Sequence, residues 1–105
     1  MAGYRVEKWS EPFLPNPAML RHLLERDGYR VFQWTDQAGA TYGRHKHDED
    51  QSHWIVSGSM ELTIEGMGTF VLNAGDRDFM PGGTYHSARV LGEEPVFYLV
   101  GAKFA

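Results

Sequence analysis

Apolar residues recur at helical spacing near the N-terminus of this 105-residue chain. They form a single stripe over residues 17–26, made of Met19, Leu20, Leu23 and Leu24. Asn16 is a good N-cap residue, Pro17 suits the first helical position, and Gly28 follows as a stop signal. The pattern therefore predicts one amphipathic helix of about three turns.

After Gly28 the pattern changes to the alternation typical of strands. Extended segments are predicted at residues 29–34, 40–47, 51–56, 61–65, 69–72, 85–90 and 96–100. Glycine-rich turns separate them, and about eight short strands with such turns indicate a sandwich or a small barrel. The length suits one all-β domain, in which residues 1–28 form an arm and a helix and residues 29–105 form the barrel.

The segment 51–56 places side chains of different character on its two faces. Gln51 and His53 share one face, and Trp54 lies on the other. A large apolar side chain needs cover, either from the N-terminal arm and helix or from a second subunit. We favour a homodimer on this ground.

Composition narrows the class of protein. The formal net charge is −4, which disfavours binding to nucleic acid, and the chain has no cysteine for disulfides or thiol chemistry. No apolar run approaches the roughly 20 residues that a membrane-spanning helix needs. The first ten residues lack the apolar region of a secretory signal, so we expect a cytoplasmic protein.

Histidine introduces candidate chemistry, because three of the five histidines lie between residues 45 and 53. His45 and His47 are two residues apart, so on a strand their side chains project from the same face. Neutral imidazole is the commonest protein ligand of divalent first-row transition metals. The pair therefore predicts two of the ligands of a metal site.

Other residues surround this pair at fixed spacings. A first group is Gly39, His45, His47 and Gly58, and a second is Gly75, Pro81, Gly83 and His86. They resemble the two motifs of the cupin superfamily, G-x5-H-x-H-x3,4-E-x6-G and G-x5-P-x-G-x2-H-x3-N, at eight of ten fixed positions. Gln51 stands where the first motif has glutamate, and Val90 stands where the second has asparagine.

This resemblance implies a small jelly-roll barrel that holds a metal inside through His45, His47, residue 51 and His86. The ion would be a divalent first-row transition metal, such as Fe, Mn, Ni, Cu or Zn. Gln51 is expected as the fourth ligand through its amide oxygen. His53, on the same face, is the alternative ligand, and Glu49 in an acidic turn is a third candidate.

Two functions follow from the resemblance. The first is a mononuclear metalloenzyme, of oxygenase or isomerase type, that acts on a small anionic, oxygen-rich substrate, with His53 as a candidate catalytic base. The alternative is a non-catalytic barrel that binds or senses a small ligand, with or without metal. Arg44, Arg77 and Arg89 are candidates for attracting an anion to the site, but we expect each to be a surface charge paired with Asp or Glu.

Overall fold

The N-terminal arm enters the fold as a strand in the computed structural model, which describes residues 3–104. The elements run β1 (Arg5–Glu7), α1 (Pro17–Arg26), β2 (Arg30–Asp36), β3 (Thr41–His45), β4 (Asp50–Ser57), β5 (Ser59–Ile64), β6 (Gly68–Leu72), β7 (Arg77–Phe79), β8 (His86–Leu91) and β9 (Val96–Lys103). Two of these strands, β1 and β7, are not in the sequence prediction. Each has three residues, too few for a periodic pattern to show.

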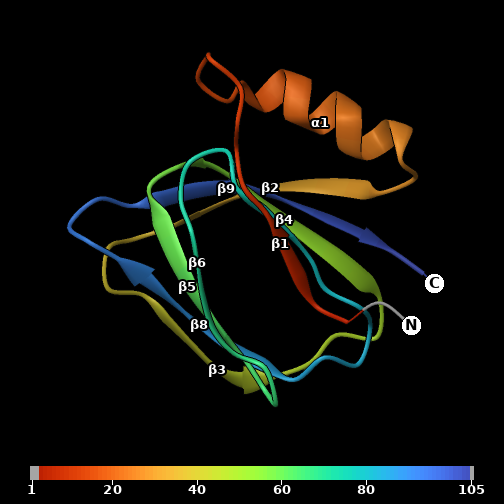
Figure 1. Ribbon diagram of the computed structural model, residues 1–105, viewed down its shortest axis with the longest axis vertical. Helices are drawn as coiled ribbons and strands as arrows, with labels where there is room; N and C mark the ends of the chain where they lie inside the picture. Colours follow the sequence, from red (N-terminus) through yellow and green to blue (C-terminus); the bar gives the residue numbers. More distant parts are fainter. Residues whose placement is uncertain (1–2, 105) are drawn as a thin grey trace.

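The strands form two antiparallel sheets that face each other (Figure 1). One has the order β1-β7-β4-β9-β2, and the other has the order β3-β8-β5-β6. Between them lies the main core, formed by Tyr4, Ile55, Met60, Leu62, Ile64, Leu72, Met80, Val90, Val96 and Tyr98. The prediction of an all-β jelly-roll barrel with one short helix is confirmed.

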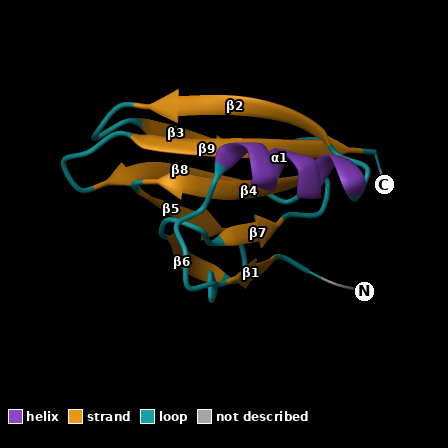
Figure 2. Ribbon diagram, turned by 90° about the horizontal axis from the view of Figure 1, so that it is seen from above, coloured by secondary structure: helices purple, strands orange, loops and turns teal. Residues whose placement is uncertain are grey.

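The helix begins and ends as its caps predict. The Asn16 side chain accepts a hydrogen bond from the Met19 amide at 3.1 Å, and Pro17 occupies the first turn. Figure 2 shows α1 lying across the outer face of the five-stranded sheet. There Leu20 and Leu24, both fully buried, pack with other residues in a second apolar cluster.

Trp54 belongs to this second cluster, with Leu99 beside it. Its side chain is only 6% exposed, because α1 and Trp9 of the N-terminal arm cover it. Trp54 is therefore covered by the N-terminal arm and helix of its own chain, and not by a second subunit. A homodimer therefore stays a prediction that Trp54 no longer supports.

Glycine is required where the chain turns between β4 and β5. Gly58 has a φ of +83°, and a β-carbon there would lie 2.5 Å from the Pro95 carbonyl oxygen. Any other residue would combine a strained backbone with a steric clash. Among residues 3–104, no helix has both the length and the apolar character needed to cross a bilayer.

Candidate metal centre

Three histidines from two distant segments of the chain converge at one end of the barrel. His45, the last residue of β3, lies directly opposite His86, the first residue of β8. His47 follows β3 by two residues. The ring centroids are 4.2 Å apart for His45 and His86, 4.9 Å for His45 and His47, and 5.3 Å for His47 and His86. One nitrogen from each ring lies within 4.8 Å of the other two, a spacing at which one ion can be shared.

A glycine turn holds the segment that carries His47. The Gly83 amide donates to the His47 carbonyl at 2.8 Å, and the Gly82 amide donates to the Asp50 carboxylate at 2.8 Å. A β-carbon on Gly82 would clash with the Asp48 carbonyl. The turn between β7 and β8 therefore fixes His47 beside His86, which explains the use of glycine at this point.

Contacts with backbone carbonyls orient two of the three imidazole rings. The Nδ1 atom of His45 lies 2.6 Å from the Gly43 carbonyl oxygen, and that of His86 lies 2.9 Å from the Thr84 carbonyl oxygen. A carbonyl accepts, so Nδ1 carries the proton in each ring and Nε2 is left with a free lone pair. Such contacts are the usual supports of metal-binding histidines.

Burial and proximity favour the neutral form of His47 and His86. Burial lowers the pKa of His47, and the neighbouring His45 and His53 lower it further. Burial also lowers the pKa of His86, with smaller contributions from the same cluster of histidines. Neutral imidazole is the form that binds metal, so the site is prepared for an ion at neutral pH.

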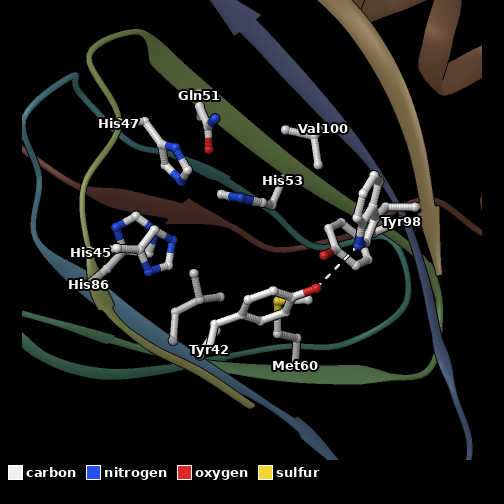
Figure 3. Close-up of a pocket in the computed structure, with 12 residues that line it drawn as sticks. Tyr42, His45, His47, Gln51, His53, Met60, His86, Tyr98 and Val100 are labelled. Carbon is white, nitrogen blue, oxygen red and sulfur yellow. Dashed lines mark hydrogen bonds between the residues drawn. The ribbon is translucent and has the colours of Figure 1, made fainter. Parts of the chain in front are cut away.

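The histidines form one end of a cavity of about 170 Å³ inside the barrel (Figure 3). Its wall consists of Trp34, Tyr42, His45, His47, Gln51, His53, Met60, Leu62, His86, Ala88, Tyr98 and Val100. Gln51 and His53 thus reach the same cavity as the three clustered histidines, as alternation along β4 predicts. Glu49 does not, because its carboxylate pairs with Arg30 at 2.5 Å.

His53 is held by a buried carboxylate. Its Nδ1 lies 3.0 Å from one oxygen of Asp78, which also accepts from the His53 amide at 2.7 Å. The Tyr4 hydroxyl donates to the second oxygen of Asp78 at 2.9 Å. Burial alone would lower the pKa of His53, but the charge of Asp78 and its hydrogen bond outweigh burial, so that pKa is raised. With Nδ1 engaged, the Nε2 atom is the one left for the cavity.

A second buried carboxylate organises the other end of the cavity. One oxygen of Asp36 accepts from Trp34 Nε1 at 3.0 Å and from the Tyr42 hydroxyl at 2.6 Å. The other accepts from the Tyr98 hydroxyl at 2.7 Å. Burial and the hydrogen bond to Asp36 raise the pKa of Tyr98. This end of the cavity therefore presents fixed aromatic rings around a carboxylate.

Sequence reasoning missed both carboxylates. Asp36 adjoins a predicted turn and Asp78 lies in a strand too short to be recognised, so each has the sequence context of a solvated residue. The expectation for the arginines holds for Arg44 and Arg89, which pair with Glu65 and Glu61 at the surface. It is wrong for Arg77, which is only 5% exposed, because β7 carries it under the N-terminal arm and helix.

The fold and the site together define a class of protein. It is a barrel of two antiparallel sheets with three histidines at one end. A family model for the cupin domain matches residues 32–101, and the chain belongs to the cupin family. The resemblance of its two motifs is thereby confirmed.

Solved structures share this fold. The DMSP lyase DddQ from Ruegeria pomeroyi DSS-3 is 28% identical with a TM-score of 0.66, over 73% of this chain and 39% of that one. An oxalate decarboxylase mutant from Bacillus subtilis is 25% identical with a TM-score of 0.64, over 70% of this chain and 21% of that one. This chain therefore spans less than half the length of either.

A DUF861 family protein from Thermotoga maritima matches over nearly the full length of both chains. It covers 95% of this chain and 99% of its own, with a TM-score of 0.63 and 22% identity. At that identity the likeness concerns the fold alone. No curated protein matches the chain.

Proposed function

We propose that this cupin is a mononuclear metalloenzyme that acts on a small anionic, oxygen-rich substrate. His45, His47 and His86 would bind a divalent first-row transition metal, with the amide oxygen of Gln51 as the fourth ligand. The observation that carries the proposal is the convergence of nitrogen atoms from the three histidines within 4.8 Å of one another. The backbone contacts of the His45 and His86 rings and the lowered pKa values of His47 and His86 fit this role.

The donor set favours an anionic partner. Three neutral imidazoles and a neutral amide leave the full double positive charge of a divalent ion, one unit more than a set that contains glutamate. A divalent ion bound here supplies Lewis-acid polarisation of a substrate oxygen. One of the similar structures is an oxalate decarboxylase, and oxalate is a small oxygen-rich anion, which supports the same substrate class.

His53 is proposed as the residue that moves a proton. His53 lies in the wall of the cavity (Figure 3). The contact of its Nδ1 with Asp78 fixes the orientation of the ring and leaves Nε2 for the cavity. A carboxylate behind an imidazole stabilises the protonated ring once it has accepted a proton. Tyr4 and the His53 amide hold Asp78 in place, so the buried carboxylate acts as a positioning residue.

The aromatic end of the cavity is proposed to bind the part of the substrate away from the histidines. The Tyr42 and Tyr98 hydroxyl groups donate to Asp36, and the Tyr42 oxygen also accepts from Trp34 Nε1 at 3.2 Å. This leaves one lone pair on Tyr42 and the lone pairs of Tyr98 as acceptors. A hydroxyl group on the substrate would match them, and the apolar walls exclude water.

One observation favours a second candidate, a non-catalytic barrel that binds or senses a small ligand. Gln51 replaces the acidic residue of the family motif, and a neutral amide holds a cation less strongly than a carboxylate does. Turnover separates the two functions. Oxygen uptake and product formation are measured with catechols, keto acids and enediols; binding without conversion of any of them supports the second candidate.

Metal binding is tested with His86→Ala and with His22→Ala as the matched control, since His22 is an exposed residue of α1. The chain is stripped with chelator, loaded with each candidate metal and analysed for bound ion. We expect about one ion per chain in the control and an affinity lower by about a hundredfold or more in His86→Ala. Equal binding by both variants would reject the proposed site. Light scattering tests the predicted homodimer separately.

A further inference from the structure

A second cavity lies on the opposite side of the five-stranded sheet from the histidines. It has a volume of about 340 Å³, twice that of the barrel cavity, and lies between the N-terminal arm, α1 and the outer face of the sheet. Its apolar wall includes Trp9, Met19, Leu23 and Trp54. Both its size and its apolar lining are typical of a site for a small molecule.

The polar side chains that line this cavity are Glu7, Lys8, Ser10, Glu11 and Arg77. The first four are exposed, whereas the guanidinium of Arg77 is buried, and its surroundings are unusual. The residue is 5% exposed, and among residues 3–104 no acidic side chain forms an ion pair with it. The guanidinium lies between two rings, 4.2 Å from the centroids of both Trp54 and Phe79. A buried charge without a counter-ion is costly, so such arginines are rare without a partner.

Part of the guanidinium remains available for a ligand. Nε and Nη2 donate to the Ser52 hydroxyl at 3.1 and 2.9 Å, whereas Nη1 has no partner among residues 3–104. Every fully buried side-chain nitrogen and oxygen in that range has a hydrogen-bond partner. Since Nη1 has none, this atom is not fully buried and is accessible. Because Arg77 lines the cavity, it presents unused donors there in the planar geometry that suits a carboxylate.

No neighbouring charge among residues 3–104 forms an ion pair with Arg77. Glu7 lies opposite it in the register of β1 and β7, but the Glu7 carboxylate is well exposed and pairs with Arg5 at 3.7 Å. Lys8, also at the cavity, pairs with Asp76 at 3.1 Å. Burial lowers the pKa of Arg77 by more than the charges of Tyr29, Glu7, Asp27 and Asp78 raise it, the direction expected for a buried cation without an ion-pair partner.

We propose that this second cavity binds a small amphipathic carboxylate, with its carboxylate on Arg77 and its hydrocarbon body against Trp9, Met19, Leu23 and Trp54. The site is independent of the proposed metal centre, because it lies on the other face of β4. Trp54 lines the second cavity and Ser52 accepts hydrogen bonds from Arg77, while Gln51 and His53 line the barrel cavity.

The test uses benzoate as the probe, with benzyl alcohol and benzylamine as controls for charge, in calorimetric titrations of the whole chain. Arg77→Met keeps the length of the side chain between the two rings and removes the charge. We expect benzoate affinity to fall by about tenfold or more in this variant, and benzyl alcohol and benzylamine to bind the unaltered chain at least as weakly. Arg5→Gln is the matched control, because Arg5 stacks on Phe79 at 3.8 Å and does not line the cavity.

Two further variants keep the test decisive if Arg77→Met does not fold. Met19→Trp fills the cavity from α1 without altering Arg77 and should abolish benzoate binding. His86→Ala alters the proposed metal centre and should leave benzoate binding unchanged. The proposal is overturned if benzoate does not bind to the unaltered chain or if benzyl alcohol binds to it equally well. It is also overturned if Met19→Trp binds benzoate normally, or if His86→Ala loses benzoate binding while the Arg77 variant keeps it.

Discussion

The Asp78 carboxylate connects the stability of the barrel to the proposed proton-transfer residue, and replacing it tests both. Asp78 is fully buried and accepts hydrogen bonds from the Tyr4 hydroxyl and from the His53 amide and ring. Asp78→Ala would leave these donors buried without an acceptor. At about 1–3 kcal/mol for each unsatisfied group, we expect a loss of about 3–5 kcal/mol of unfolding free energy.

Asp78→Asn gives a finer test, because it keeps the shape and removes the charge. The folded-state pKa of His53 is raised above its unfolded value. Its pairing with Asp78 therefore adds stability that is fully present below the unfolded pKa of about 6.5 and is lost as pH rises through the folded pKa. The difference in unfolding free energy between the unaltered chain and Asp78→Asn should therefore be largest below pH 6.5. It should shrink as pH rises through the folded-state pKa of His53.

Urea denaturation of metal-free protein at several pH values measures both effects. Asp27→Asn is the matched control, because Asp27 is exposed at the end of α1 and should change stability by less than about 0.5 kcal/mol. A loss below about 1 kcal/mol for Asp78→Ala, or a stability difference for Asp78→Asn that grows with pH, would refute the account of His53 and Asp78.

Three other outcomes are expected. Gln51→Glu should tighten metal binding in equilibrium dialysis because it adds a negative charge to the ligand set, and unchanged affinity would exclude Gln51 as a ligand. Gly75→Ala should cost about 2–4 kcal/mol in urea denaturation, since Gly75 has a φ of +89° and contacts the Trp9 ring; a neutral effect would contradict that packing. The pKa values of His47 and His86 are lowered from 6.5, so dialysis against buffers of falling pH should release metal only below that value, and release above it would contradict the assigned neutral state.

The sequence predicts the parts of this molecule that rest on local rules. Asn16 and Pro17 mark the start of α1 through backbone hydrogen bonding and a fixed φ, which act within a few residues. The resemblance of the two motifs to those of cupins implies that their histidines meet inside the barrel. His45 and His86 are indeed direct partners in the sheet.

Residues whose role depends on distant partners are the ones that the sequence does not reveal. Asp36 and Asp78 have the character of turn or surface residues until Tyr98 and Tyr4, far along the chain, contact them. Arg77 is buried because an arm and a helix that precede it by some fifty residues or more fold over its strand. An acidic residue beside aromatic strand residues, as in Trp34–Asp36, is the signal that would have pointed to the first of these carboxylates.

The most direct test of the metal centre is a crystal structure of metal-loaded protein with anomalous scattering measured at the absorption edge of the ion. The account predicts one peak inside the barrel, about 2.0–2.3 Å from the Nε2 atoms of His45, His47 and His86. A peak that contacts fewer than two of these rings, or metal bound only at the protein surface, would contradict it.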